Sequence, residues 1–589
     1  MSPSARFDDL RPKSRRGFSL GPIEDVVVAR TLDEVQPALA AAEEAVRQGR
    51  WVGGWIAYEA APAFDPALRV RTTASTDFAG LPLVWMAVSD RRLGTSPTAA
   101  GSHRLGRWEP LTSPEHHHRS VEDIRERIRQ GTTYQVNHTF LLRSRFDGDP
   151  ASLYHSLTRA QSCGYGALID SGEWVVVSAS PELFFEWQNG VITCRPMKGT
   201  ARRGVDLAED ERMRAWLEAS EKNRAENLMI VDMVRNDVGR IAQVGSVNVP
   251  AIFNTEKYDT VWQLTSTVTA RPRTGTGLVD VFTALFPSAS ITGAPKVSTM
   301  GIISELETHP RGVYCGAIGF GGPGPEGPEW AFNVGIRTVV IDRPGGVAVY
   351  GTGGGITYDS EPGDEYAEAL LKAEVLQRRD AELALIETTR WDPDRGTRHL
   401  DRHLERATAS ASYFDIPFDP AEVRTAIARA VKERETPVQL RIRVERRGWV
   451  TVELADLPAP AGEVRLAIDN RPIDRHHVFL YHKTTLRGVY EAAADRHPGA
   501  DDVILWNENR ELTETTIGNL ALHIDGAWVT PPVSSGLLAG TERAHRLATG
   551  ELTERIVTLE ELKRVTGFAR LNSVRGWEEA TLMNSRSSR

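Results

Sequence analysis

The sequence is poor in cysteine and has no long apolar run. Three cysteines occur in 589 residues and none forms a CxxC pair, which excludes a disulfide framework and a cysteine-rich zinc site. No apolar segment is long enough to span a bilayer, and the basic N-terminus is not followed by the apolar stretch of a secretion signal. We therefore expect a cytoplasmic protein without a membrane partner.

An excess of charge is also missing. Seventy Lys and Arg stand against 79 Asp and Glu, a formal net charge of −9, and the charges are dispersed along the chain. Such a chain is a poor candidate for non-specific nucleic-acid binding, so we expect no nucleic-acid partner. With 41% hydrophobic and 25% charged residues, the composition is that of a globular protein and excludes disordered and coiled-coil classes.

Helical and strand patterns succeed one another and predict an α+β protein with two unequal units. Residues 1–376 form the first unit, 377–383 a linker, 384–575 the second unit and 576–589 a frayed tail. Within the first unit, residues 206–239 are predicted to be helical.

Three adjacent histidines, His116–His118, suggest a metal site at first sight. Neighbouring residues on regular structure point in different directions, so three adjacent imidazoles do not face one ion. We favour a solvated loop over a metal site here.

One lysine in the first unit is a candidate nucleophile. Lys198 stands in an apolar, glycine-flanked string, RPMKGT, where loss of hydration would lower its pKa and make the amine reactive. Glu182 lies on the other side of a predicted hairpin turn at Asn189-Gly190 and could serve as a general acid beside it. The alternative is that Lys198 is an ordinary exposed loop residue.

Three glutamates in the same unit suggest a divalent cation. Glu226 stands in the predicted first turn of a helix, and Glu365 and Glu368 are three apart on one helix face. Carboxylates that converge from separate helices provide the oxygen ligands that Mg²⁺ prefers. The alternative is a solvated acidic face, with Glu226 simply placed at the favourable end of the helix dipole.

A glycine-rich string and a lone arginine complete this set. The string 351–355, GTGGG, precedes the helix of Glu365 and offers main-chain N–H groups to an anion, although a single glycine-rich loop is weak evidence. Arg337 stands in the apolar string FNVGIRTVVI, predicted to be a strand. A charge there needs a partner, and a ligand carboxylate is one candidate.

These strings, in this order, resemble the chorismate-utilising family over roughly residues 20–376. The resemblance rests on the strings SPELF, RPMKGTARRG, AENLMIVDMVRND, FPSASITGAPK, RGVYCGAIGF, FNVGIRT and GTGGGITYDSEPGDEYAE. It implies a large α+β unit in which two packed sheets surround a site for chorismate and Mg²⁺.

The resemblance also implies an activity and roles for individual residues. Family members that form anthranilate usually carry Ala where Lys198 stands, and Lys there resembles the members that aminate chorismate at C4. Lys198 would displace the C4 hydroxyl with Glu182 as proton donor, and ammonia would then displace Lys198. Metal ligands are implied at Glu226 and Glu368, with Glu365 nearby. Substrate-binding positions are implied at Ser290, Tyr314, Arg337, Gly353, Gly354 and Gly355.

Two glutamines distinguish this chain within the family. Relatives that add water to chorismate carry a lysine base where Gln135 stands, which argues against isochorismate or salicylate formation. Many members carry histidine where Gln263 stands, and Gln cannot exchange a proton as His does. If that histidine assists departure of the hydroxyl in relatives, Glu182 or water must do more here.

A second lysine dominates the second unit. Lys483, in FLYHKTTLRGVYEAA, follows an apolar strand-like stretch, and a partly buried lysine is the residue that forms a Schiff base with pyridoxal phosphate. Glu514 follows Lys483 by 31 residues in the sequence, and a carboxylate there could pair with the pyridinium nitrogen.

The second unit resembles the class IV pyridoxal-phosphate enzymes, which include aminotransferases and aminodeoxychorismate lyase. The match is carried by ETTRW, HLDRHLERATASASYF, the Lys483 string, ELTETTIGNLAL and SGLLAGTERA. It implies a smaller α/β domain in which the phosphate is held by Arg406, the Ile517 backbone and Thr541. Arg487 and Tyr490 are weaker candidates for binding substrate carboxylates. Class IV members usually begin with an N-terminal hairpin, which this chain lacks.

The two resemblances together imply consecutive reactions. Chorismate would be aminated to 4-amino-4-deoxychorismate, and the class IV unit would eliminate pyruvate to give 4-aminobenzoate. The alternative is an aminase joined to an aminotransferase or a scaffold. No cysteine lies in a G-x-C-x-G glutaminase string, Cys163 being the nearest, so a separate glutamine amidotransferase subunit is expected. Class IV enzymes are often dimers, which makes a homodimer a further expectation.

Overall fold

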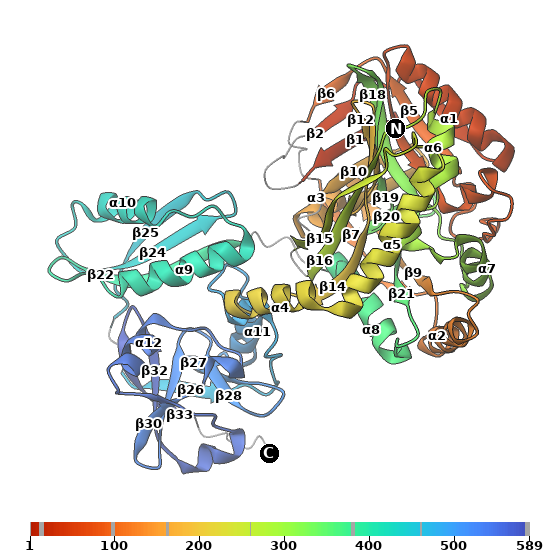
Figure 1. Cartoon of the computed structure of the whole chain (residues 1–589). Coiled ribbons are helices and arrows are strands. Elements are labelled where there is room, and N and C mark those ends of the chain that lie inside the picture. Colours follow the sequence, from red (N-terminus) through yellow and green to blue (C-terminus); the bar gives the residue numbers. More distant parts are fainter. Residues whose placement is uncertain are drawn as a thin grey trace. The chain divides into compact units, whose positions relative to one another are not determined.

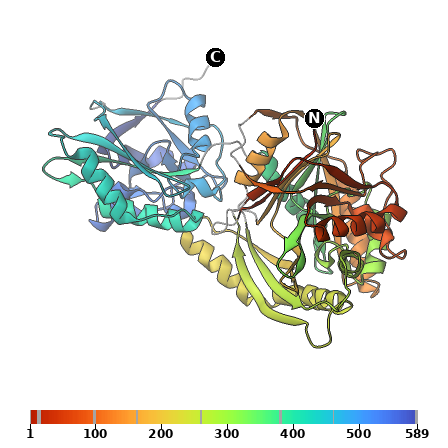
Figure 2. The same ribbon diagram turned by 90° about the horizontal axis from the view of Figure 1, so that it is seen from above.

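The computed structural model describes residues 2–10, 17–95, 101–160, 164–258, 261–377, 383–459 and 462–583. The chain divides into two compact units, shown in two orientations in Figures 1 and 2. Unit 1 comprises Met1–Arg202 and Arg214–Asp380, and unit 2 comprises Arg203–Met213 and Ala381–Arg589. Cys163 and most of the predicted linker 377–383 lie outside the described residues.

Unit 1 contains two large sheets. The first runs, in order, β17 (Gly293–Ala294), β9 (Gln135–Gly148), β21 (Val347–Ile356), β20 (Thr338–Asp342), β11 (Trp174–Ser180), β10 (Tyr165–Asp170), β1 (Ser4–Asp9), β2 (Gly17–Leu20) and β6 (Arg92–Gly94), with β7 (His103–Leu105) and β8 (Glu109–Pro110) beside β9. The second runs β14 (Met197–Arg202), β16 (Val261–Ala270), β13 (Val191–Arg195), β12 (Leu183–Gln188), β19 (Gly327–Val334), β18 (Ala317–Gly324), β4 (Trp51–Ile56), β5 (Val84–Ser89) and β3 (Asp25–Ala29), with β15 (Asn248–Lys257) beside β16.

The two sheets pack face to face. One buried cluster joins Phe7 and Val176 of the first sheet to Trp55 and Ile318 of the second. Each of these large side chains contributes roughly 2–3 kcal/mol when it leaves water. The helices of unit 1 are α1 (Leu32–Arg47), α2 (Pro114–Arg129), α3 (Pro150–Ala160), α5 (Glu221–Gly239), α6 (Leu278–Leu285), α7 (Lys296–Leu306) and α8 (Pro362–Ala373), with short 3-10 turns at η1 (Tyr58–Ala63), η2 (Ala289–Ile291) and η3 (Glu374–Gln377). The expected two-sheet α+β unit is confirmed.

Unit 2 also holds two sheets, and it is smaller. Its first sheet runs β23 (Gly396–Thr397), β22 (Ala384–Asp392), β24 (Val438–Glu445) and β25 (Val450–Asp456). Its second runs β28 (Leu512–Thr515), β27 (Asp502–Trp506), β26 (Val464–Ile468), β33 (Gly576–Leu582), β32 (Val565–Asn572), β29 (Asn519–Ile524), β30 (Ala527–Thr530) and β31 (Thr553–Glu554). The helices are α9 (Leu400–Phe414), α10 (Pro420–Val431), α11 (Gly488–Arg496) and α12 (Thr541–Ala548), with 3-10 turns at η4 (Val478–Leu480), η5 (Val533–Ser535) and η6 (Leu559–Arg564). Helices α9 and α10 share a buried cluster with β22 and β24.

Two expectations about local structure were wrong. The predicted tail from residue 576 begins too early, because Gly576–Leu582 is strand β33, which pairs with β32 and β26. The helical prediction for residues 206–239, by contrast, is confirmed, and the stretch forms two helices, α4 (Leu207–Ala219) and α5. They are separated at Ser220, whose side chain caps α5.

The predicted loop at His116–His118 is the first turn of α2. Ser113 caps this helix and Pro114 occupies its first position, a combination that starts helices. His117 is 1% exposed. Among the described residues, no three His, Cys, Asp or Glu side chains are grouped to hold a metal ion. Over all the residues that the structure describes, no helix is long and apolar enough to cross a membrane.

Candidate active sites

Lys198 lies on β14 at the edge of the second sheet of unit 1. Burial lowers the pKa of its amine, although nearby glutamates act in the opposite direction. Its Nζ is 4.0 Å from Oε2 of Glu226, and its main-chain oxygen accepts a 3.0 Å hydrogen bond from the Asn227 amide. The helix α5 that carries both residues therefore fixes the main chain at Lys198. The alternative of an exposed loop lysine is wrong.

Glu182 lies directly before β12 and is 4% exposed. Burial raises the pKa of its carboxyl to about 7, while a hydrogen bond from Ser290 and the charge of Lys198 partly oppose that rise. The Ser290 hydroxyl donates to Oε1 of Glu182 at 2.6 Å. Glu182 can therefore hold a proton at neutral pH close to the Lys198 amine, which is the condition for a general acid.

The glycine string lies in a strand and not in a turn. Gly353, Gly354 and Gly355 belong to β21, where they pair with residues of β9. A Cβ at Gly355 would lie 2.2 Å from Nζ of Lys198 and 2.3 Å from Nε2 of Gln135. The absence of a side chain at this position keeps the space between the two sheets open beside Lys198. Gln135 is 1% exposed, and its Oε1 has no partner within the described residues, as expected of a group that binds a ligand.

Three carboxylates and one further amine face the same lysine. The charges of Glu226, Glu365 and Glu368 all act on the pKa of Lys198, and so does that of Lys372. Glu226 stands on the second turn of α5 and not on the first, and Glu365 and Glu368 share α8. Lys372 Nζ lies 2.9 Å from Oε1 of Glu368 and donates to the Gly353 carbonyl at 3.0 Å.

Tyr258 connects Arg337 to the same region. Arg337 lies in the short connection between β19 and β20, not within a strand, and its φ of 51° is left-handed. Its guanidinium carbon is 5.9 Å from the centre of the Tyr258 ring. The Tyr258 hydroxyl lies 3.4 Å from the carbonyl of Pro181 and 4.0 Å from Sδ of Met197, the residues that precede Glu182 and Lys198.

Tyr314 and Gln263 are the other two residues considered for the substrate site, and they lie in a turn before β18 and on β16. Tyr314 is 6% exposed and packs against Gly351, where a Cβ would come within 2.2 Å of its ring. Gln263 lies on β16, opposite Thr200 of β14, and its Nε2 donates to the Thr200 hydroxyl at 3.0 Å. Gln263 thus supports the strand that carries Lys198.

Unit 2 contains a cavity of about 590 Å³, and Lys483 and Glu514 both line it. Burial lowers the pKa of Lys483 to about 8, with help from the charge of Arg406. Burial raises the pKa of Glu514 to about 7. The Tyr490 hydroxyl donates to Oε1 of Glu514 at 2.7 Å, and Asn519 donates to Oε2 at 3.1 Å. The Lys483 amine, which loses its proton readily, and the Glu514 carboxyl, which two hydrogen bonds fix in place, thus share one cavity.

The remaining class IV residues line the same cavity. Thr541 opens α12, whose N-terminus favours an anion, and the Thr515–Gly518 turn lies beside it on the cavity wall. Ile517 is 56% exposed, so its main chain and not its side chain is suited to a phosphate. Arg406 donates to Oε1 of Glu387 at 3.0 Å and to the Ala539 carbonyl at 2.9 Å.

A buried chain of polar groups extends from Arg406. Glu387 accepts from Arg406 and also lies 2.6 Å from Nδ1 of His403, whose Nε2 is 3.1 Å from the Thr541 hydroxyl. These ion pairs hold the pKa of Glu387 at about 2 despite its burial. The network fixes Arg406 and Thr541 relative to each other.

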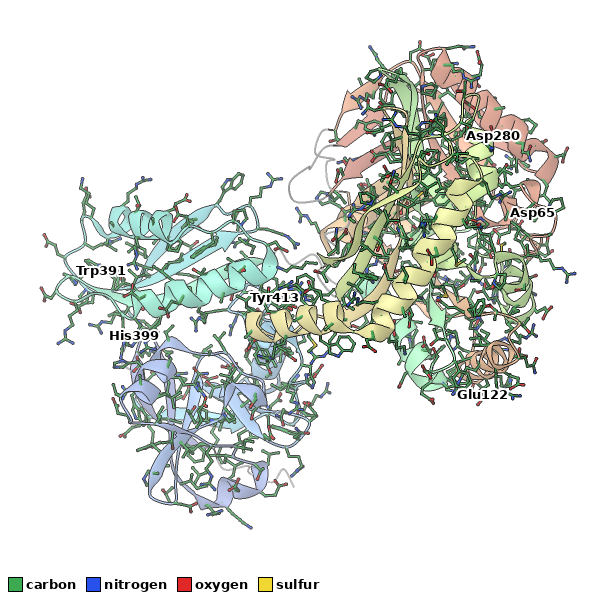
Figure 3. The ribbon with its side chains drawn as sticks, viewed as in Figure 1. Asp65, Glu122, Asp280, Trp391, His399 and Tyr413 are labelled. Atoms are coloured by element: carbon green, nitrogen blue, oxygen red, sulfur yellow. The ribbon has the colours of Figure 1, made fainter. Side chains whose placement is uncertain are left out.

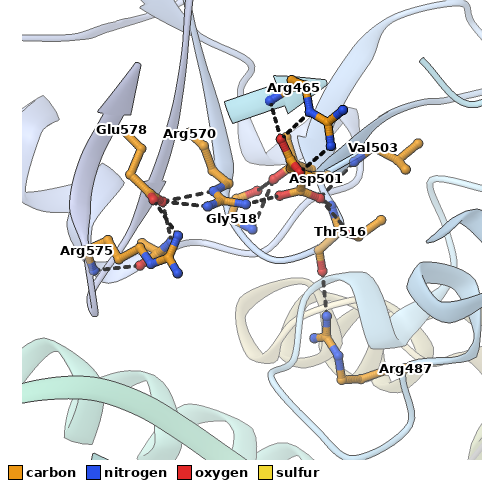
Figure 4. Close-up of polar contacts among 12 residues, drawn as sticks. Arg465, Arg487, Asp501, Val503, Thr516, Gly518, Arg570, Arg575 and Glu578 are labelled. Carbon is orange, nitrogen blue, oxygen red and sulfur yellow. Dashed lines mark hydrogen bonds and ion pairs between the residues drawn. The ribbon is translucent and has the colours of Figure 1, made fainter. Parts of the chain in front are cut away.

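Arg487 and Arg570 line the cavity, and Figure 4 shows polar contacts that they make. Buried Arg570 lies 3.2 Å from Asp502 and 2.8 Å from Glu578. Arg487 donates to the Thr516 carbonyl at 2.5 Å and lies over the Tyr490 ring at 4.6 Å. These contacts fix the two arginine side chains in place, and Arg487 still lines the cavity.

Sequence reasoning missed four residues of these sites: Lys372, Tyr258, Glu387 and His403. Lys372 is four residues after Glu368, a spacing that places both on one helix face and could have been noticed. Glu387 lies in the quoted ETTRW string. Nothing local marks Tyr258 as a site residue, because Pro181, Met197 and Arg337, which it contacts at the site, are distant in sequence.

Two family models match the chain. The model for chorismate binding enzyme covers residues 13–378. The chain belongs to this family. The model for amino-transferase class IV covers residues 384–581 and implies pyridoxal phosphate as cofactor. Both resemblances drawn from the motifs are confirmed, and the chain is an enzyme.

Curated relatives of the family match about half of this chain. Aminodeoxychorismate synthase of Streptomyces griseus is 40% identical over 298 residues, covering 50% of this chain and 40% of the relative. Aminodeoxychorismate synthase component 1 of Klebsiella aerogenes is 39% identical over 281 residues, covering 47% of this chain and 60% of the relative. The match thus spans less than two thirds of either relative.

A solved structure shows the same fold in unit 1. The crystal structure of anthranilate synthase component I from Streptococcus pneumoniae superposes with a TM-score of 0.52 at 24% identity, covering 64% of this chain and 91% of that one. At this identity the likeness concerns the fold alone.

Proposed function

We propose that this enzyme converts chorismate and ammonia to 4-aminobenzoate and pyruvate in two steps, one in each unit. The observation that carries the proposal is that each unit holds a largely buried lysine acting electrostatically on a carboxyl whose pKa burial raises to about 7: Lys198 on Glu182, and Lys483 on Glu514, which line one cavity. Relatives named aminodeoxychorismate synthase support the first step. We assign residues 1–376 to the first step and the class IV region from residue 384 onward to the second.

In the first step, the neutral Lys198 amine attacks the ring of chorismate and the C4–oxygen bond breaks. Glu182 gives its proton to the departing hydroxyl, which leaves as water. Ammonia then forms a bond to C4, the bond to Lys198 breaks, and the Glu182 carboxylate takes up the proton that ammonia releases. The products are 4-amino-4-deoxychorismate and water. Lysine at position 198, where relatives that make anthranilate usually carry alanine, favours amination at C4.

Chorismate carries two carboxylates, and cationic side chains would bind them. Lys372 supplies positive charge that acts on Lys198, Arg337 supplies it beside Tyr258, and Gln135 offers an unpaired buried amide oxygen to a ligand hydroxyl. Ser290, Tyr314 and the Gly353–Gly355 strand would shape the pocket. These assignments are part of the proposal.

Mg²⁺ suits the donor chemistry of Glu226, Glu365 and Glu368, because carboxylate oxygens are its preferred protein ligands. In the structure one of them, Glu368, is paired with the Lys372 ammonium. The three carboxylates are not grouped as a metal site in the described chain. Mg²⁺ binding therefore requires the Lys372–Glu368 pair to open, and we route no step of the reaction through the ion.

The cavity of unit 2 fits pyridoxal phosphate. Lys483 would supply the amine for the cofactor aldehyde, Glu514 a carboxyl for its ring nitrogen, and Arg406, Thr541 and the Ile517 main chain an anion site, all of them on the wall of this cavity. The bound cofactor supplies an electron sink for the carbon that bears the substrate amine. Lys483 would remove the proton from C4 of the substrate, and Glu514 would hold the ring. Arg487 and Tyr490 would orient the substrate at the cavity wall.

A product assay with single lysine variants tests both steps. The chain with chorismate, ammonium, Mg²⁺ and pyridoxal phosphate should give 4-aminobenzoate and pyruvate in equal amounts. Lys198→Ala should abolish amination yet still process supplied aminodeoxychorismate, and Lys483→Ala should accumulate that intermediate. Formation of no pyruvate by the unmodified chain would favour the rival, an aminase joined to an aminotransferase or a scaffold.

A separate glutamine amidotransferase subunit would supply ammonia in the cell. The Klebsiella aerogenes relative is named component 1, which implies a second component. With glutamine as the nitrogen source, the purified chain should make product far more slowly than with ammonium. A homodimer is a further proposal, which the mass of the purified protein in solution would test.

A further inference from the structure

A segment from the middle of the chorismate-binding sequence belongs structurally to unit 2. Residues Arg203–Met213 cluster with the class IV region although they follow Lys198 by only a few residues and lie within the first family match. Helix α4 begins in this segment. The segment thus adds residues from elsewhere in the chain to the region that the class IV family model matches from residue 384.

The segment is folded around one buried ion pair. Arg203, 9% exposed, donates to both carboxylate oxygens of Asp210, at 2.6 and 2.8 Å, and Asp210 is 1% exposed. The Gly204 amide also donates to Asp210 at 3.0 Å, and a Cβ at Gly204 would lie 2.1 Å from the Asp210 nitrogen. A buried bidentate pair of this kind is costly to break from one side.

This pair contacts the last turn of α9 through Tyr413. Arg203 donates to the Tyr413 carbonyl at 3.0 Å, and its guanidinium carbon lies 4.3 Å from the centre of the Tyr413 ring. The Tyr413 hydroxyl donates back to the Gly204 carbonyl at 2.7 Å. Figure 3 labels Tyr413 at this end of α9, beside the first turn of α4.

Tyr413 in turn contacts the residue before the class IV lysine. Its ring centre lies 4.4 Å from that of His482, which is 4% exposed and 2.9 Å from the Ser410 hydroxyl. Arg203 and Asp210 both act electrostatically on His482. His482 is bonded to Lys483, whose main-chain oxygen accepts a 2.9 Å hydrogen bond from the Ile386 amide. The Lys483 main chain is therefore held between β22 and the Tyr413–His482 contact.

We propose that Arg203 is a positioning residue for the reaction of unit 2, which it serves through Tyr413 and His482 by fixing the main chain at Lys483. The proposal rests on the proposed function, since it assumes that Lys483 binds pyridoxal phosphate. A segment that follows the first catalytic lysine in sequence thereby becomes part of the support of the second.

The test measures pyridoxal-phosphate binding by the full-length protein. Arg203→Met should weaken cofactor affinity at least tenfold and shift the pH midpoint of the bound cofactor's absorbance by more than half a unit, because the Lys483 amine is displaced. The neighbouring exposed residue gives the control, Arg202→Met, which should match the unmodified chain in both measurements. Arg203→Lys, which keeps the charge, should recover part of the affinity.

Tyr413→Phe is a second test, for the case in which Arg203→Met does not fold. This substitution removes the hydrogen bond from the Tyr413 hydroxyl to the Gly204 carbonyl and keeps the aromatic ring. We expect it to weaken cofactor affinity about threefold and to shift the same pH midpoint in the same direction. Affinity and midpoint unchanged in both Arg203→Met and Tyr413→Phe would overturn the inference. Failure of the unmodified chain to bind the cofactor would instead contradict the proposed function, so the two failures are distinguishable.

Discussion

The Ser290 hydroxyl donates a 2.6 Å hydrogen bond to Oε1 of Glu182, and both side chains are buried. This bond stabilises the charged carboxylate and limits the rise in its pKa that burial causes. Amination needs Glu182 protonated, so we expect the amination rate to fall as the pH rises through about 7.

Ser290→Ala should shift this fall in the amination rate to higher pH. Without the hydrogen bond the carboxylate is less stable, so the pKa of Glu182 rises and the proton is retained to higher pH. A hydrogen bond to a charged group contributes about 1.5–3 kcal/mol, which corresponds to a shift of about one pH unit or more. The pH profile of amination with ammonia held in excess measures it. Ser288→Ala is the control, because Ser288 contacts Ser290 and not Glu182; an unmoved limb in Ser290→Ala would contradict the assignment of Glu182.

Gly355→Ala should block the first step and leave the second intact. The new Cβ would lie 2.2 Å from Nζ of Lys198 and 2.3 Å from Nε2 of Gln135, so both groups must move from their positions. We expect amination to fall about a hundredfold, as when reacting groups are displaced by about 1 Å. Elimination from supplied aminodeoxychorismate is the internal measurement that should not change. Gly363→Ala, a helical glycine with open space around it, should leave both rates unchanged.

Lys372→Met should raise the pH at which amination begins, that is, the rising part of the plot of amination rate against pH. The Lys372 charge lowers the pKa of Lys198, so its removal raises that pKa. The reactive neutral amine then appears only at higher pH, and activity at low pH falls. Lys432→Met, an exposed lysine of unit 2, is the matched control. A profile that moves to lower pH would show that Lys372 does not act on Lys198 as described.

Glu387→Gln should destabilise unit 2 at neutral pH. The folded-state pKa of Glu387 is lowered from 4.5 to about 2, so it adds stability that is present above pH 4.5 and is lost as the pH falls towards 2. A difference of this size corresponds to about 3 kcal/mol, and the substitution removes it by leaving Arg406 and His403 without their charged partner.

Thermal unfolding of unit 2, followed from pH 7 to pH 3, measures this effect. The unmodified chain should lose stability over that range, and Glu387→Gln should start lower at pH 7 and change less. Glu405→Gln, an exposed glutamate on α9, should behave as the unmodified chain. Equal unfolding temperatures for Glu387→Gln and the unmodified chain at pH 7 would contradict the role of the ion pairs.

The sequence by itself determined the two families and the two lysines. Strings such as RPMKGTARRG and ELTETTIGNLAL are local, so their residue types and order are readable without coordinates. The Lys198–Glu182 pairing was expected from the hairpin between them, because hairpin turns bring nearby strands together.

Only the tertiary structure decided what surrounds those residues. The glycine string was expected to be a loop, because glycine favours loops locally, whereas Gly353–Gly355 lie in strand β21 and the lack of a side chain at Gly355 makes room for Lys198 and Gln135. The tail at 576 became a strand because β26 and β32 pair with it, and such partners lie far away in sequence. The membership of Arg203–Met213 in unit 2 has the same origin. Arg203 finds Tyr413 across 210 residues of chain, and packing at that separation leaves no pattern in the local sequence.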